Sequence, residues 1–154
     1  MLLYGGMKFK IQQKDINKVT KGLLNKVLKT KNDKASIIAL SGNMGAGKTT
    51  LTQDLAKEIG IKEVVVSPTF VIMKIYNVSP SSEYFSSFKK MIHIDAYRLE
   101  SNEDLENIGW SKISRDKDNL IIIEWPENIK EHLDPKSTYV LLEHVDDETR
   151  TFEF

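Results

Sequence analysis

The apolar residues of this chain fall into short runs and helical stripes that alternate along the sequence. Residues 37–40 are a continuous apolar run, typical of a strand buried on both faces. Residues 120–123 form the most apolar run, and residues 91–94, which include one histidine, form another. Apolar residues recur at helical spacing over residues 16–30 and 51–59. The pattern predicts a mostly parallel buried sheet with helices packed against it.

Shorter and less regular patterns predict strands around this centre. Residues 7–12 alternate weakly, whereas residues 64–66, three consecutive valines before Ser67 and Pro68, predict a further buried strand. Residues 70–76 alternate over part of their length, which predicts a strand with one exposed face and an antiparallel flank to the sheet. Residues 138–142 and 149–154 predict a terminal hairpin with an acidic turn between them.

Capping residues set the expected helix ends. Asp15 can cap the helix of residues 16–30. Ser101 and Asp104 have the spacing of a capping box, which predicts a short helix. Pro126 suits the first turn of another short helix through residue 131. Polar loops are expected over residues 77–90 and 111–119.

Composition places few limits on this picture. The chain of 154 residues suits one domain, residues 1–154, with residues 1–6 as a flexible N-terminal segment and Met7 as an alternative start. The 22 basic and 22 acidic residues cancel, so no global basic field attracts nucleic acid, although a local patch is not excluded. Without cysteine there is no disulfide. No apolar run approaches the ~20 residues of a membrane span, and no secretory signal is expected.

The most specific chemical signal is the segment of residues 42–49, which fits the phosphate-loop pattern Gly-x4-Gly-Lys-Thr without a mismatch. It lies between an expected strand and an expected helix, the context in which such a loop curls its amides around phosphate. Lys48 is expected to reach the β- and γ-phosphates and Thr49 to bind Mg²⁺. The residues expected to hold the nucleotide here are Asn43, Met44, Gly45, Ala46, Gly47, Lys48, Thr49 and Thr50. The expected fold is therefore a three-layer α/β fold of the P-loop NTPase type, with a mostly parallel sheet and antiparallel flanking strands.

Hydrolysis needs a carboxylate near the metal and a group that orients water. Glu124 ends the run of residues 120–123, and Asp95 ends that of residues 91–94, so both are expected where strand ends meet the ligand. Thr69 follows a Ser-Pro turn that can aim its hydroxyl at a γ-phosphate or a water. The alternatives are solvated residues at strand ends for the two acids and a simple turn residue for Thr69.

Three neighbouring side chains have open roles. Trp125 covers the site or packs in the core, and core packing is the simpler interpretation. His93 points away from its apolar neighbours and is interpreted as a packed or solvated histidine, not as a base. Arg98 steadies a carboxylate or a partner surface, or forms an ordinary surface ion pair.

Taken together, the ordered motifs resemble the TsaE family, the ATPases of bacterial tRNA threonylcarbamoyladenosine biosynthesis. The resemblance covers about residues 10–150. Besides the phosphate loop it is carried by Ser-Pro-Thr-Phe at 67–70, His-Ile-Asp-Ala-Tyr-Arg-Leu at 93–99 and Ile-Glu-Trp-Pro at 123–126. Position 43 departs from the family, which usually has aspartate where this chain has Asn43, and Met44 stands where leucine is common.

The resemblance implies a small cytoplasmic enzyme that hydrolyses ATP with Mg²⁺ to reset or remodel a complex of TsaD-like and TsaB-like proteins. Those partners modify adenosine 37 of tRNAs that read ANN codons, so the resemblance implies that this chain acts on tRNA indirectly, through the complex. The sequence leaves direct contact with tRNA open. By position, Thr49 and Glu124 would hold Mg²⁺, and Thr69 and Asp95 fall on sensor-like positions. Trp125 matches the tryptophan beside the acid, and Arg150 matches a late basic residue near the nucleotide.

Three alternatives share the phosphate loop. A small-molecule or nucleotide kinase commonly clamps the transferred phosphoryl group with arginines, and this chain has only Arg98, Arg115 and Arg150. A GTPase is disfavoured because the segment that resembles a guanine-recognition motif, residues 30–33, precedes the phosphate loop and no Asp-x-x-Gly motif follows the loop. A nucleotide-dependent binding module would bind ATP tightly without turnover.

Overall fold

The computed structural model describes residues 6–154, so most of the N-terminal segment expected to be flexible lies outside the described residues. The described strands belong to one sheet in the order β1-β7-β6-β2-β5-β4-β3. Their bounds are β1 Lys8–Gln12, β2 Ser36–Ser41, β3 Met73–Asn77, β4 Lys90–Asp95, β5 Asn119–Glu124, β6 Thr138–His144 and β7 Thr149–Glu153. Strands β6, β2, β5 and β4 run parallel, whereas β1, β7 and β3 pair antiparallel at the two sides. The mostly parallel sheet with antiparallel flanks is confirmed.

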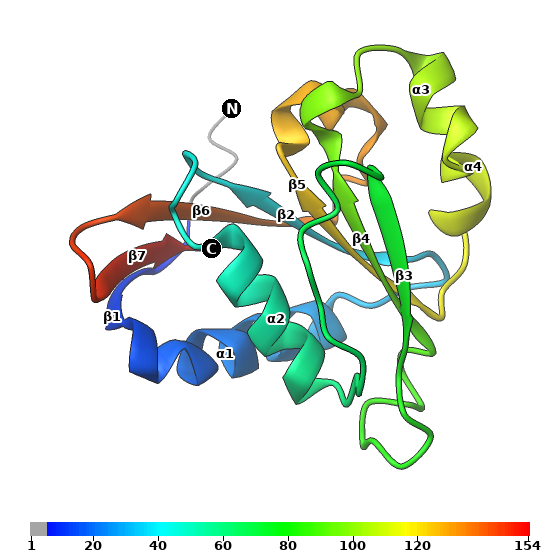
Figure 1. Cartoon of the computed structure of the whole chain (residues 1–154). Helices are drawn as coiled ribbons and strands as arrows, with labels where there is room; N and C mark the ends of the chain where they lie inside the picture. Colours follow the sequence, from blue (N-terminus) through cyan, green and yellow to red (C-terminus); the bar gives the residue numbers. More distant parts are fainter. Residues whose placement is uncertain (1–5) are drawn as a thin grey trace.

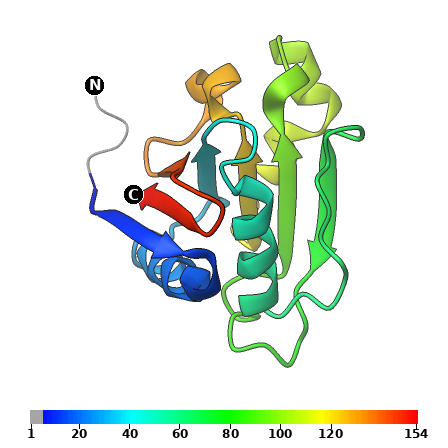
Figure 2. The same ribbon diagram turned by 60° about the vertical axis from the view of Figure 1, so that its left-hand side comes forward.

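Helices cover both faces of this sheet, which gives three layers (Figures 1 and 2). One face carries the two longest helices, α1 (Ile16–Lys29) and α2 (Lys48–Glu58). The other carries the short helices α3 (Asn102–Asn107) and α4 (Trp110–Ile113). The 3-10 turns are η1 Gln13–Asp15, η2 Ala96–Arg98, η3 Pro126–Asn128 and η4 Lys130–His132.

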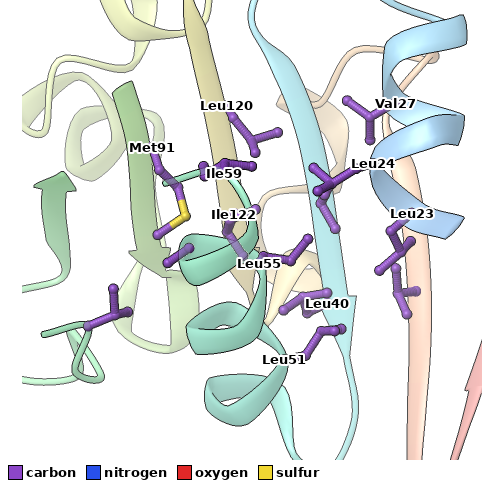
Figure 3. Close-up of a cluster of buried hydrophobic side chains, with 14 of the residues drawn as sticks. Leu23, Leu24, Val27, Leu40, Leu51, Leu55, Ile59, Met91, Leu120 and Ile122 are labelled. Atoms are coloured by element: carbon purple, nitrogen blue, oxygen red, sulfur yellow. The ribbon is translucent and has the colours of Figure 1, made fainter. Parts of the chain in front are cut away.

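The alternating side chains of the central strands build two cores, one on each face. Leu40 and Ile122 meet α2 residues such as Leu51 and Leu55 on one side of the sheet (Figure 3). Ile121 and Ile123 pack into the other core. Strands buried on both faces explain why the sequence of β5 is continuously apolar up to its terminal acid.

The register of the parallel strands aligns their chemical ends. Asp95 at the end of β4 lies opposite Glu124 at the end of β5, and Glu124 lies opposite Leu40 of β2. Ser41 then leads directly into the phosphate loop. Parallel pairing therefore places two carboxylates and the loop at one edge of the sheet.

The strand expected over residues 64–66 is wrong. This segment is irregular, with Val64 84% exposed and Val65 buried at 5%. Gln53 of α2 donates to the Val65 carbonyl oxygen over 2.9 Å, so that backbone group is satisfied by a side chain. Strand propensity is realised only where a partner strand is present, and residues 64–66 pair with no strand of the described sheet, although β3 forms its edge.

The next expected strand begins later than residue 70. Phe70 is 91% exposed, and Ile72 has a φ of 67°. A positive φ is strained for a β-branched residue and breaks the extended backbone, so β3 starts at Met73. The strand still forms the antiparallel flank expected for this region.

Smaller differences concern helix ends. The capping box of Ser101 and Asp104 is present, but the Asp15 side chain makes no capping bond and instead pairs with Lys18 at 3.3 Å. Helix α4 overlaps the loop expected over residues 111–119, because the buried Trp110 anchors it to the core. The helix expected from Pro126 is two 3-10 turns.

Candidate functional site

The phosphate loop joins the end of β2 to the start of α2, as its sequence predicts. Gly47 has a φ of 102° at the N-cap of α2, and Gly45 has a φ of 81°. Such angles suit glycine and let successive amides turn toward one point. A Cβ at Gly47 would lie 3.8 Å from Nε of Arg150, so the arginine from β7 covers the loop closely. The first turn of α2 adds free amides and the positive end of its dipole.

Lys48 is held inside the loop it follows. Its side chain is buried, and Nζ donates to the carbonyl oxygens of Gly42 and Asn43, at 2.5 and 3.2 Å. The same Nζ lies 4.8 Å from the centre of the Trp125 ring. Burial lowers the pKa of Lys48, while the nearby charges of Glu124 and Asp95 act in the opposite direction. The ammonium group is therefore partly desolvated and oriented toward the loop.

Glu124 lies beneath the start of α2 and is only 5% exposed. The Thr49 hydroxyl donates to its Oε1 atom over 3.4 Å. Nε2 of His93 lies 3.0 Å from the same oxygen. Because an ionised carboxylate only accepts hydrogen bonds, Nε2 of His93 carries the proton in this contact. The carboxylate is thus oriented from two elements, α2 and β4.

Asp95 is the second buried carboxylate at this edge, with 6% exposure. Its Oδ2 accepts a hydrogen bond from the Thr69 hydroxyl at 3.1 Å, and its Oδ1 accepts one from the Tyr97 amide at 3.0 Å. Thr69 is fixed further by the Ser67 hydroxyl at 2.7 Å and by the Arg98 guanidinium, which donates to the Thr69 carbonyl oxygen. Arg98 therefore steadies the Ser-Pro-Thr turn and makes no ion pair among residues 6–154.

Lys48, Thr49, Glu124, Asp95 and Thr69 line one cavity of about 480 Å³, within the range of small-molecule sites. Asn43 and Ala46 do not line it. Asn43 is exposed to solvent, and Ala46 is buried in the core. The expected residues that line the cavity are Met44, Gly45, Gly47, Lys48, Thr49, Thr50, Thr69, Asp95, Glu124, Trp125 and Arg150.

Trp125 covers the cavity and does not belong to either core. The simpler interpretation, core packing, is therefore wrong. Its φ of 56° turns the chain sharply after β5, so that the ring lies over Lys48 and 5.3 Å from the Tyr97 ring. The following Pro126 continues this turn into η3.

Three contributors were not assigned to the site from sequence: Ser67, which lines the cavity and contacts the Thr69 hydroxyl, His93 and Tyr97. His93 is fully buried, as a packed histidine would be, but it also contacts Glu124. Tyr97 lines the cavity and packs against Trp125. The signal for His93 was its position two residues before Asp95, which puts both side chains on the same face of β4.

The donor set fits Mg²⁺. The Thr49 hydroxyl and the Glu124 carboxylate approach each other within 3.4 Å. Among residues 6–154 no group of three or more histidine or acidic side chains is placed to hold a metal alone. Mg²⁺ commonly uses one or two protein oxygens and takes the rest from phosphate and water, so a sparse set of this kind suits it.

A parallel sheet with a phosphate loop after β2 and carboxylates at neighbouring strand ends defines the P-loop NTPase fold. The crystal structure of YdiB from Bacillus subtilis superposes with a TM-score of 0.68 over 98% of this chain and 85% of that chain, at 22% identity. This similarity supports the fold.

The chain belongs to the TsaE family, since the model described as "Threonylcarbamoyl adenosine biosynthesis protein TsaE" matches residues 12–152. Proteins named tRNA threonylcarbamoyladenosine biosynthesis protein TsaE are similar to it. The one from Haemophilus influenzae is 34% identical over 121 residues, 79% of this chain and 71% of that protein. The one from Bacillus subtilis is 30% identical over 118 residues, which span 77% of this chain and 68% of that protein. The Borreliella burgdorferi protein is 42% identical over 91 residues, and the match spans 59% of this chain and 60% of that protein.

None of the helices described in residues 6–154 combines the length and the apolar character needed to cross a membrane.

Proposed function

We propose that this chain is a Mg²⁺-dependent ATPase that acts in the cytoplasm on a complex of TsaD-like and TsaB-like proteins. In this role it supports formation of threonylcarbamoyladenosine at position 37 of tRNAs that read ANN codons. Family membership supports the pathway. The observation that carries the enzymatic part is the meeting of Thr49 and Glu124, at 3.4 Å, directly below a phosphate loop that holds Lys48.

Binding of ATP would use the loop and its lysine. The amides of residues 43–50 would donate to phosphate oxygens, and Nζ of Lys48 would exchange the carbonyls of Gly42 and Asn43 for the β- and γ-phosphates. Arg150, which lies over Gly47, would neutralise further phosphate charge. Trp125 and Tyr97 would shield this end of the cavity from bulk water, which strengthens its electrostatic interactions.

Hydrolysis would then require a water in line with the γ-phosphorus. Asp95 and Thr69 form the polar pair available on that side, and they would orient the water through the Asp95 carboxylate and the Thr69 hydroxyl. The new bond would join the water oxygen to phosphorus and the bond to the β-phosphate oxygen would break. One proton of the water would stay on the inorganic phosphate, the other would pass to solvent, and ADP and phosphate would leave. Thr49 and Glu124 would hold Mg²⁺, which would supply positive charge against the charge that develops on the phosphates.

A surface beside the cavity supports action on a protein partner. Phe70 and Val71 follow Thr69 and are 91% and 58% exposed, and Met44 and Tyr97 at the cavity are 92% and 61% exposed. A group of large exposed apolar side chains commonly marks a protein interface. A partner seated here would contact the turn that holds Thr69, and so would be placed to influence turnover.

The kinase alternative would need several arginines to clamp the transferred phosphoryl group. Arg150 is the one arginine that lines the cavity among the described residues, and a phosphoryl-transfer lid commonly supplies several.

The test measures phosphate release by the purified chain, alone and with TsaD-like and TsaB-like proteins from the same organism. We expect slow Mg²⁺-dependent release alone, faster release with the partners, and loss of both on chelation by EDTA. Phosphate release without any acceptor distinguishes the ATPase from a kinase. Tight ATP binding with no turnover, even with the partners, would instead show a nucleotide-dependent binding module.

A further inference from the structure

The charges of this chain are strongly segregated along the sequence, although they cancel in total. Residues 1–35 hold 9 of the 22 basic residues and 2 of the 22 acidic ones, a net charge of +7, so the remainder carries −7. A lysine-rich composition by itself would not separate the two signs. The positive charge is concentrated on η1, α1 and the segments beside them.

Much of this charge lies along one line of the surface. Lys14, Lys18, Lys21, Asn25 and Lys29 follow one another at intervals of three or four residues, the spacing of one helix face, and all are exposed. We call this row the α1 lysine stripe. The opposite side of α1 is anchored in the core by Leu23, Leu24 and Val27 (Figure 3), so the stripe faces solvent.

The α1 lysine stripe has little internal compensation. Helix α1 contains no acidic residue, and within residues 6–154 the ion pair of Lys18 with Asp15 is the only one made by the stripe. Like charges three or four residues apart destabilise a helix, and Lys14 and Lys18 lie at the positive end of the α1 dipole. On an ordinary solvent-exposed helix, glutamates usually alternate with lysines and reduce this repulsion. The repulsion within the stripe is unfavourable for folding, and a polyanionic ligand would relieve it.

Beside the stripe runs an apolar groove between β1 and α1, with a volume of about 680 Å³. Its floor includes Phe9 and Phe154, whose ring centres are 5.4 Å apart. Lys18 and Lys29 of the stripe also line it, and Lys26 lies 5.9 Å from the centre of the Phe154 ring. The groove therefore joins half-buried aromatic rings to a row of cations.

We propose that the α1 lysine stripe and this groove bind RNA directly, with the lysines along the phosphodiester backbone and an unpaired base against Phe9 and Phe154. Positive charge beside aromatic rings is the combination that single-stranded nucleic acid requires. An anionic membrane is a poorer match because the apolar groups lie in a concave groove and the apolar face of α1 is buried. The site is formed by other residues than those of the nucleotide loop, so it does not depend on ATP hydrolysis.

The test measures binding of the full chain, without partners, to a fluorescent single-stranded RNA of about 12 nucleotides. One variant changes Lys14, Lys18, Lys21 and Lys29 to glutamine. The matched control changes four exposed lysines outside this surface to glutamine, namely Lys57, Lys62, Lys112 and Lys130. The melting temperature and the ATPase rate of each variant are also measured. We expect both ATPase rates and the melting temperature of the control to match the parent, and the melting temperature of the stripe variant to match or exceed it.

We expect the stripe variant to lose more than tenfold in affinity and the control variant less than threefold. For single strands each phosphate contact contributes about −0.7 to the slope of log affinity against log salt, so the slope should become less steep by about 3 in the stripe variant. No binding by the parent chain, or equal losses in the two variants, would overturn the proposal. Equal binding of poly-glutamate or of anionic vesicles at the same salt would overturn the assignment to RNA.

A second substitution, Phe154→Leu, tests the groove while preserving apolar volume. Stacking on one aromatic side chain contributes enough that its loss should weaken binding of the single strand about fivefold or more. Binding of a fully paired RNA duplex, which offers no unpaired base, should change less than twofold. Equal effects on the two RNAs would contradict the role assigned to the aromatic floor.

Discussion

The Nε2 atom of His93 lies 3.0 Å from Oε1 of Glu124, and both side chains are buried. The contact crosses from β4 to β5 and orients the carboxylate that approaches Thr49. His93 therefore acts on the proposed metal site through Glu124 and does not itself reach the cavity.

We expect His93→Leu to lower ATP turnover about 10- to 100-fold, the usual effect of removing a partner that orients a metal ligand. The half-saturating Mg²⁺ concentration should rise, because the Glu124 carboxylate loses its fixed orientation. His93→Gln should recover much of both, since its amide can donate from a similar place. Calorimetric titration of Mg²⁺ into the protein with ADP gives a readout independent of turnover. Equal defects in the leucine and glutamine variants would show that His93 acts only by packing.

Lys48 should determine the stabilisation by nucleotide. ATP with Mg²⁺ at about 100 times its dissociation constant should add about 2.7 kcal/mol to the free energy of unfolding. For a chain of this size that corresponds to a rise of roughly 5–10 °C in melting temperature. Lys48→Ala should remove most of the rise, because the phosphates lose their cation. The measurement is thermal unfolding with and without ATP, and a parental shift in the variant would disprove the phosphate-loop assignment.

Glu124→Ala should separate turnover from binding. The carboxylate lies beside Thr49 and not among the amides of the loop, so ATP affinity should fall less than turnover does. A decrease in turnover of 10²-fold or more is expected if the carboxylate positions the metal. Steady-state phosphate release and equilibrium binding of a fluorescent ATP analogue measure the two effects. Unchanged turnover would remove Glu124 from the mechanism.

The pair of Thr69 and Asp95 predicts an effect of the hydroxyl alone. Thr69→Val keeps the shape of the side chain but removes the hydrogen bond to Asp95, and it should lower turnover about tenfold or more with little change in ATP affinity. Thr69→Ser keeps the hydroxyl and should stay within about threefold of the parent. Single-turnover rates at saturating ATP provide the comparison. Similar rates for the valine and serine variants would assign Thr69 to the turn alone.

Local signals in the sequence predicted much of this structure because their causes are local. The phosphate loop needs glycines at positive φ between a strand and a helix, and Gly45 and Gly47 supply them within a few residues. The run ending in Glu124 is apolar because β5 is buried on both faces. This burial can be recognised from the sequence of that one strand. The capping box at Ser101 is likewise a contact between near neighbours.

Contacts between distant residues were decided by tertiary structure. Valines 64–66 have strand propensity, but a strand forms only where the chain pairs with a neighbouring strand, and this segment pairs with none of the described strands. Trp125 lies over the cavity because its φ is positive, and the sequence pattern did not predict this backbone conformation. The contact of His93 with Glu124 exists only because β4 pairs with β5 in one register, and a shift by one residue would turn His93 to the opposite face. The sequence alone therefore determined which segments carry the chemistry, since hydrophobic period and loop geometry act over short distances, whereas strand pairing determined which of their side chains meet.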